Sequence, residues 1–174
     1  KSHHATQPDE KYKVPSYRDL YIDLGLRTAS EVRTNGIDIG SPIVYKPSAE
    51  VIGDEKIIGT SVDDRAGCAV LLEVARQINS RAAGPEINIV FTVQEEFNLR
   101  GALPVAQKIK PEIAIQIDLL LASDTPDMRD FGEIKLGEGP GISMFSFHGR
   151  GTLNGVIPHP VLVKHFEQAA SKEN

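Results

Sequence analysis

The 174-residue sequence has little or none of several features that define common classes of protein. Its single cysteine, Cys68, rules out a disulfide within the chain and suits a reducing compartment such as the cytoplasm. With a formal net charge of −5 and no block of basic residues, it is a poor partner for nucleic acid or an anionic membrane. No apolar run reaches the roughly 18–20 residues of a membrane-spanning helix. Residues 1–13 are polar and do not resemble a signal peptide.

The first 59 residues have the pattern of small-domain β structure. Residues 30–36 are expected to form a short helix, with Ser30 as its N-cap and Gly36 as its stop. Alternating or β-branched segments predict strands at residues 19–26, 42–46, 50–52 and 56–60, with a turn at 53–55.

From residue 60 onward the sequence is typical of an α/β protein, because helical and apolar β-type segments alternate. Helices are predicted at residues 63–80, 101–109 and 158–174. Apolar, β-branched runs at 87–93 and 113–121 predict two buried strands with a helix between them. This order predicts a mixed, mostly parallel sheet with flanking helices.

Carboxylates stand at the ends of these elements. Glu95 and Glu96 follow the first apolar run, Asp63 and Asp64 begin a helix, and Asp118 interrupts the second run. Open α/β sheets bind ligands at the carboxyl ends of their strands. A charged Asp118 inside an apolar strand would lose hydration, and a bound cation would offset that cost.

Ordinary structural roles explain part of this pattern. An aspartate at a helix start can cap the helix, a glutamate pair can belong to a solvated loop, and Asp118 can be half solvated at a strand end. Helix capping needs only one of the two adjacent aspartates, however. The sequence therefore favours a cluster of carboxylates that holds divalent metal ions.

Three blocks carry a resemblance to a known family. Residues 63–68 read Asp-Asp-Arg-Ala-Gly-Cys, residues 92–102 read Thr-Val-Gln-Glu-Glu-Phe-Asn-Leu-Arg-Gly-Ala, and residues 117–126 join Ile-Asp to Ala-Ser-Asp-Thr-Pro. In this order they resemble the glutamyl aminopeptidase and tetrahedral aminopeptidase family of dinuclear metallo-exopeptidases, which includes Frv-type aminopeptidases. The resemblance implies a zinc-exopeptidase-like catalytic domain at residues 60–174. It also implies that residues 1–59 are part of a small, barrel-like inserted β domain used for dimerisation.

The resemblance also implies a role for each carboxylate. Asp63 would bridge two divalent ions, zinc or cobalt, while Glu96 holds one ion and Asp118 the other. Glu95 would be the general base that activates water for attack on a peptide substrate. The peptide bond between Asp63 and Asp64 would be cis. The implied assembly is a homo-oligomer, often of twelve subunits, in the cytoplasm.

The sequence departs from the family pattern in its histidines and in one loop. No His-x-Asp segment is present, and the family's second ligating histidine would come after Asn174, so the chain looks like a fragment without either imidazole ligand. Phe97 and Asn98 replace a small apolar residue and a glycine, and asparagine tolerates positive φ better than most residues do. Surface or packing roles are expected for the histidines present, which are His3, His4, His148, His159 and His165.

Two other functions compete with a peptidase. Without imidazole, three carboxylates hold transition metals weakly, which favours a non-catalytic chain kept for assembly through its β domain. A glycoside hydrolase would use paired carboxylates on either side of one bond, roughly 5–9.5 Å apart. Glu95 and Glu96 are sequence neighbours and fit that arrangement poorly. Cys68 is expected to be a small core residue.

Overall fold

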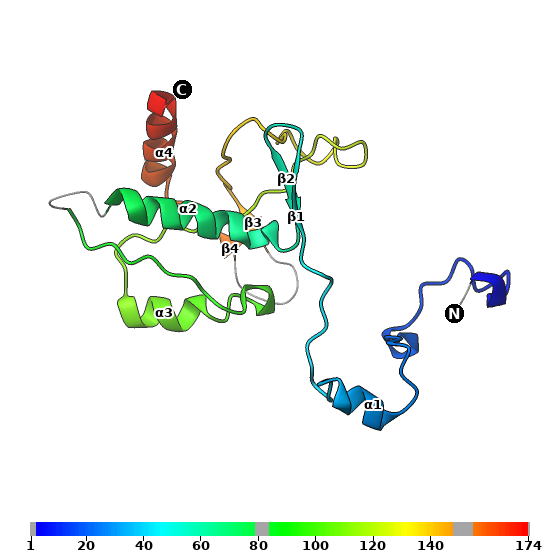
Figure 1. Cartoon of the computed structure of the whole chain (residues 1–174). Coiled ribbons are helices and arrows are strands. Elements are labelled where there is room, and N and C mark those ends of the chain that lie inside the picture. Colours follow the sequence, from blue (N-terminus) through cyan, green and yellow to red (C-terminus); the bar gives the residue numbers. More distant parts are fainter. Residues whose placement is uncertain (1–2, 79–83, 148–154, 174) are drawn as a thin grey trace. The chain divides into compact units, whose positions relative to one another are not determined.

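The computed structural model describes residues 3–78, 84–147 and 155–173 (Figure 1). The chain divides into two compact units, residues 1–46 and residues 47–174. The expected boundary between an inserted domain at residues 1–59 and a catalytic domain at 60–174 stays a prediction.

The first unit contains short helices and, within its described residues, no strand. Its elements are the 3-10 helices η1 (His3–Ala5) and η2 (Tyr17–Asp19) and the α-helix α1 (Ala29–Thr34). The N-cap of α1 is Thr28 rather than the predicted Ser30, because the Thr28 side chain accepts a hydrogen bond from Glu31 N. Gly36 ends the helix as predicted, with φ of +76° and its N–H bonded to Arg33 O.

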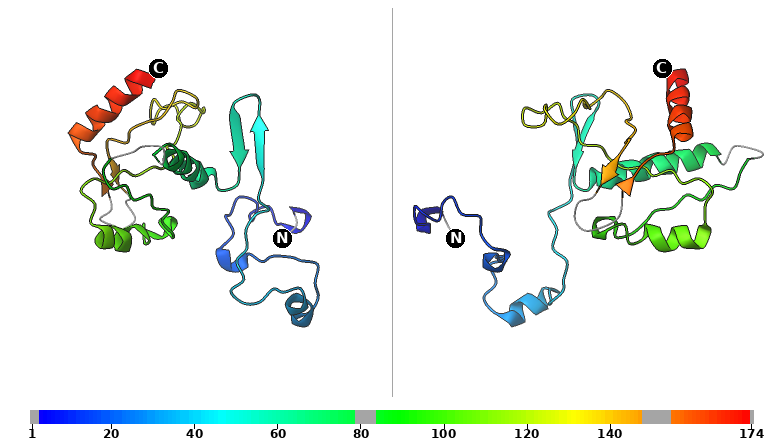
Figure 2. Two further views of the ribbon diagram at one scale, coloured as in Figure 1. Left: turned by 60° about the vertical axis from the view of Figure 1, so that its left-hand side comes forward. Right: turned by 180° about the vertical axis from the view of Figure 1, so that it is seen from behind.

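The second unit opens with the predicted hairpin, which leads directly into the helix α2 (Val62–Ile78) (Figure 2). Strands β1 (Ala49–Ile52) and β2 (Lys56–Gly59) pair antiparallel, with Ala49 opposite Gly59 and Ile52 opposite Lys56. Gly53 turns the chain with φ of +63°. Thr60 N extends the pairing by donating to Ser48 O at 2.8 Å. The strands predicted at residues 19–26 and 42–46 do not form, since neither segment has a strand partner among the described residues.

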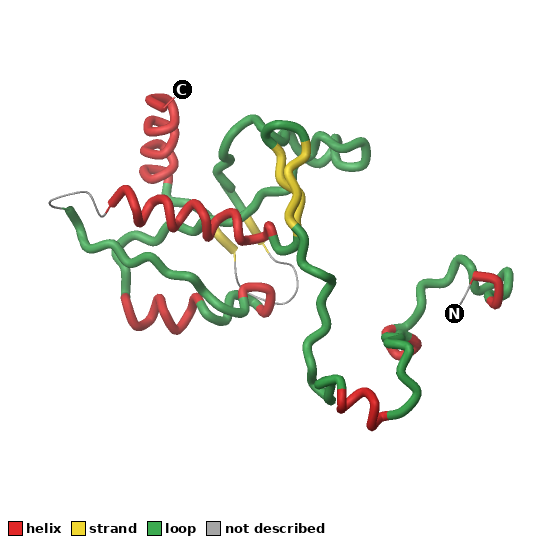
Figure 3. The backbone as a smooth tube through the Cα atoms, viewed as in Figure 1, coloured by secondary structure: helices red, strands yellow, loops and turns green. Residues whose placement is uncertain are grey.

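The three predicted helices of the second unit are confirmed. They are α2, α3 (Ala102–Ile109) and α4 (Pro160–Glu173) (Figure 3). The end of the helix predicted at residues 63–80 lies outside the described residues. Within the described part of the chain, no helix is both long and apolar enough to cross a membrane.

The mostly parallel sheet is not confirmed, although the mixture of helices with small sheets is consistent with the α/β class. Both sheets of the described chain are two-stranded and antiparallel, the second joining β3 (Ser146–Phe147) to β4 (Gly155–Val156). Residues 87–93 and 113–121 form no backbone ladder (Figure 3). A strand needs a neighbour for its N–H and C=O groups, and an apolar, β-branched sequence does not supply one.

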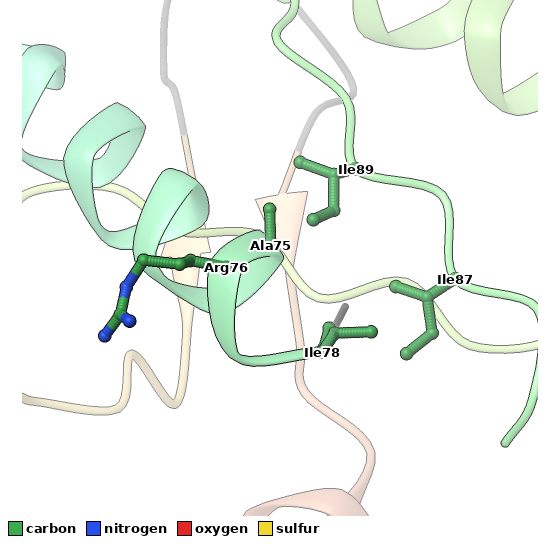
Figure 4. Close-up of a pocket in the computed structure, with 5 residues that line it drawn as sticks. All are labelled: Ala75, Arg76, Ile78, Ile87 and Ile89. Atoms are coloured by element: carbon green, nitrogen blue, oxygen red, sulfur yellow. The ribbon is translucent and has the colours of Figure 1, made fainter. Parts of the chain in front are cut away.

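These segments instead meet helices through their side chains. Figure 4 shows Ile87 and Ile89 beside Ala75 and Ile78 of α2, with the Arg76 guanidinium directed away from them. A second hollow lies between residues 113–115 and α4, and it is lined by Ile113, Ile115, Val161, Leu162, His165 and Phe166.

Few apolar side chains in the described residues are covered. Val163 in α4 is 9% exposed and makes up the buried apolar core, whereas Leu121 is 82% and Phe131 79% exposed. Exposed apolar surface of this extent marks regions that contact another surface.

The loop of residues 123–136 is held by its own polar groups. Ser123 is 7% exposed, and both its N–H and its hydroxyl donate to Ile134 O, at 2.7 and 3.0 Å. Asp124 accepts a hydrogen bond from Leu136 N at 3.2 Å. These contacts close the loop at its base.

We predict that Ser123→Ala lowers the free energy of unfolding by about 1 kcal/mol, because it removes a buried hydrogen bond to a carbonyl that keeps one other donor. Denaturation in urea measures the change. Ser171→Ala, at an exposed helical site whose hydroxyl bonds Glu167 O, is the control and should change stability by less than about 0.5 kcal/mol. Equal effects of the two substitutions would contradict the role of Ser123.

Candidate metal centre

Three aspartates from two parts of the chain converge in the second unit. Each of Asp63, Asp64 and Asp118 offers one carboxylate oxygen, and these three atoms lie within 4.8 Å of one another. Asp63 and Asp64 stand at the start of α2, whereas Asp118 lies on the extended segment after α3. A divalent cation can accept oxygen ligands from such a group.

The start of α2 is irregular at the two adjacent aspartates. Asp63 (φ −82°, ψ 111°) and Asp64 (φ −116°, ψ 54°) have non-helical backbone angles. The peptide bond between them is cis, as the family resemblance predicted.

Asp64 caps the regular part of α2. Its Oδ1 accepts a hydrogen bond from Gly67 N at 2.8 Å, which satisfies one of the free N–H groups at the helix start. Gly67 is buried, and a β-carbon at this position would overlap the Asp64 carboxylate. Asp64 therefore caps the helix, and the Asp63 carboxylate is not needed for capping.

Asp118 differs from the sequence-based expectation in its exposure. Its side chain is exposed, and its Oδ1 accepts a hydrogen bond from the next residue, Leu119, at 2.8 Å. The argument that burial in an apolar strand forces a cation partner on Asp118 is therefore wrong. Its place in the cluster follows instead from its proximity to Asp63 and Asp64.

The electrostatics of the cluster act on Asp63. Partial desolvation, followed by the negative charges of Asp118, Glu96 and Asp64, raises the pKa of the Asp63 carboxyl above its ordinary value. A cation bound among these groups would remove the repulsion, so the excess of negative charge favours cation binding.

Glu95 and Glu96 lie on the 3-10 helix η3 (Glu95–Phe97). The flanking residues Gln94 and Asn98 both have left-handed backbone angles, with φ of +56° and +67°. Asparagine tolerates the positive φ at position 98 better than most residues do, though less freely than glycine. Both glutamates are exposed.

The structure brings together part of the predicted ligand set. Asp63, Asp64 and Asp118 lie in the close group and Glu96 lies outside it, while the ligand roles of Asp63, Glu96 and Asp118 stay predictions. Glu96 is still near enough for its charge to act on Asp63. Sequence reasoning missed Asp64 as a member of the cluster, although its adjacency to Asp63 was the available signal.

Two of the histidines, His159 and His165, make contacts at the start of α4 and within it. His159 Nδ1 accepts a hydrogen bond from Val161 N at 3.3 Å and caps α4, and His165 meets the ring of Phe166 edge-on at 6.4 Å between centroids. Neither is in the aspartate cluster. The side chains of His3 and His148 are outside the described part of the chain. Cys68 is a half-buried free thiol.

A group of carboxylates of this kind could hold a divalent ion of the sort that metal-dependent hydrolases use. The sequence matches the family described as M42 glutamyl aminopeptidase over residues 1–174. The chain belongs to this family, whose aminopeptidases are hydrolases and are in general metal-dependent.

Several curated relatives support this assignment. The chain is 37% identical over 174 residues to "Putative aminopeptidase SgcX" of Escherichia coli (strain K12), covering 100% of this chain and 47% of the relative. It is 32% identical to the lysyl aminopeptidase of Pyrococcus furiosus (70% and 34% covered) and 31% identical to the glutamyl aminopeptidase of Lactococcus lactis (76% and 37%). The chain thus spans less than half the length of these relatives. No solved structure matches it.

We predict that Gly67→Ala destabilises the protein by about 1 kcal/mol only while Asp64 is present, because the new β-carbon displaces the capping carboxylate. In an Asp64→Ala background the same change should stabilise the protein by about 0.5–1 kcal/mol, the usual gain for alanine over glycine in a helix. Urea denaturation of the wild type, the two single variants and the double variant gives the coupling free energy between the two positions. Additive effects would show that the carboxylate and Gly67 do not interact.

A second prediction concerns Asp63 and pH. Because the pKa of Asp63 is raised on folding, the folded state holds this proton more tightly than the unfolded state does, and its contribution to stability falls as pH rises from about 4. In the presence of a chelator, Asp63→Asn should therefore raise Tm at pH 7, and the gain should shrink as pH falls towards 4. Thermal melts at both pH values measure this, with the exposed Asp130→Asn as control. A loss of Tm at pH 7 in Asp63→Asn would contradict it.

Proposed function

We propose that this chain supplies carboxylates of the active site of a metal-dependent aminopeptidase, which removes N-terminal residues from peptides. The observation that carries the proposal is the approach of Asp63 to Asp118 from separate elements, in a chain that belongs to an aminopeptidase family. The relatives named for glutamyl and lysyl aminopeptidase activity support peptide substrates.

In this proposal the carboxylates divide the binding of two divalent ions, zinc or cobalt. Asp63 would bridge both ions, Glu96 would hold one, and Asp118 would hold the other. The raised pKa of Asp63, to which Asp118 and Glu96 contribute, supports a common site for these three groups. The bound ions would lower the pKa of water and polarise the scissile carbonyl.

Glu95 acts as the general base. Its position next to Glu96 on η3 supports this role, because a carboxylate that is not itself a ligand is free to carry a proton. Its carboxylate accepts a proton from the attacking water and passes it to the amine of the leaving peptide. Since the carboxylate carries the proton between two steps, its loss should slow chemistry more than substrate binding.

One observation favours a contribution to assembly as well. Large apolar side chains of the first unit are exposed, among them Tyr12 at 92% and Val14 at 93%. This exposure supports the second candidate function, a non-catalytic chain kept for assembly through residues 1–59. A glycoside hydrolase finds no support in the family assignment.

We predict that Glu95→Gln in the purified natural gene product lowers kcat on a peptide anilide by about 10²–10⁴-fold, because the amide cannot accept the proton. Its content of divalent ions should stay at the wild-type level, and a chelator should abolish the wild-type activity. Elemental analysis and steady-state kinetics measure these outcomes, with Glu133→Gln as an exposed control. Wild-type rates in Glu95→Gln would refute the role of Glu95. A wild-type protein without metal and without activity would refute the aminopeptidase function and favour the assembly function.

A further inference from the structure

The loop that carries Glu95 and Glu96 is closed at its base by backbone atoms. Its two arms run from residue 93 to 95 and from 99 to 101, and they are joined by three hydrogen bonds. These are Gly101 N to Val93 O at 3.0 Å, Arg100 N to Gln94 O at 3.2 Å and Leu99 N to Glu95 O at 2.9 Å.

Gly101 allows the arms to approach this closely. A β-carbon on Gly101 would lie 2.7 Å from Val93 N and 3.2 Å from Val93 C, and nearer still to Val93 O. These are backbone atoms, so no side-chain rotation can make room. The φ of Gly101 is −73°, an angle that any residue adopts. Glycine is therefore required here for space and not for backbone conformation.

We propose that Gly101 is a positioning residue for Glu95 and Glu96, because its lack of a side chain lets the loop close against Val93 and fixes both carboxylates. This inference rests on the function proposed above, in which Glu95 is the base and Glu96 a metal ligand. Any larger residue at position 101 must push the two arms apart and move the η3 turn between them.

A small displacement of this turn has a large functional effect. Metal ligands and catalytic bases act only within a narrow range of geometry, and a shift of about 1 Å can cost roughly 100-fold in rate. The left-handed angles at Gln94, Asn98 and Leu99 show that the loop already holds an uncommon backbone. Its closed base is what keeps that backbone in place.

The test compares Gly101→Ala with Gly84→Ala in the natural gene product. Gly84 is the matched control, since an added β-carbon there meets nothing within 4 Å. Binding of Co²⁺ is measured by titration calorimetry, and kcat and KM are measured on a peptide anilide. Gly101→Ala should weaken Co²⁺ binding and lower kcat by roughly 10–100-fold each, with KM little changed, while Gly84→Ala should match wild type.

A third variant separates positioning from general stability. Val163→Ala removes buried apolar volume from α4, far along the chain from the loop, and should lower Tm without changing Co²⁺ affinity. All assays are run where circular dichroism shows the variants folded. Wild-type affinity and kcat in Gly101→Ala would overturn the proposal, and so would an equal loss of affinity in Val163→Ala. A wild type that binds no Co²⁺ would overturn the proposed function, and the positioning role with it.

If Gly101→Ala does not fold, a second pair of variants tests the same loop. Asn98 has φ of +67°, which glycine accepts and a β-branched residue resists. Asn98→Val should therefore weaken Co²⁺ binding by roughly 10-fold or more, and Asn98→Gly should keep the wild-type value. Equal Co²⁺ affinity in the two variants would show that loop geometry does not position the glutamates.

Discussion

Repulsion among carboxylates is the constraint around which the second unit is arranged. Asp63 meets the negative charges of Asp118, Glu96 and Asp64, and no described lysine, arginine or histidine lies within ion-pair distance of it. Packing does not compensate for this repulsion, since the aspartates are exposed or only half buried. A cation bound among these carboxylates would relieve the repulsion between them.

Two glycines make this concentration of charge possible. Gly67 leaves room for the Asp64 carboxylate at the start of α2, so Asp64 can cap the helix and still lie beside Asp63 and Asp118. Gly101 leaves room for the backbone of Val93, so the loop with both glutamates can close. In both cases another group lies where the β-carbon of a larger residue would be, and neither glycine has positive φ. The acidic motifs and their glycines therefore form single structural units.

The sequence predicted the helices of the second unit and the hairpin well, because periodic apolar residues, a glycine turn and cap residues act locally. It placed the N-cap of α1 two residues late, since Thr28 and Ser30 are both good caps and only the structure distinguishes them. Residues 87–93 and 113–121 do not by themselves determine a parallel sheet, because a strand is defined by its neighbours. At the site, the motifs pointed to Asp63 and Asp118, whereas helix capping explains Asp64, although its adjacency to Asp63 also places it in the cluster.

The chemistry of the cluster limits which metals it favours. Carboxylate oxygens alone suit hard cations, whereas zinc and cobalt gain from imidazole nitrogen. His159 and His165 are engaged in capping and packing α4, and neither joins the aspartates. A preference for zinc or cobalt would therefore have to come from ligands other than these two histidines. The same carboxylates would still supply the bridging and charge that a two-metal hydrolase requires, so the acidic motifs and the source of metal selectivity are separate parts of the site.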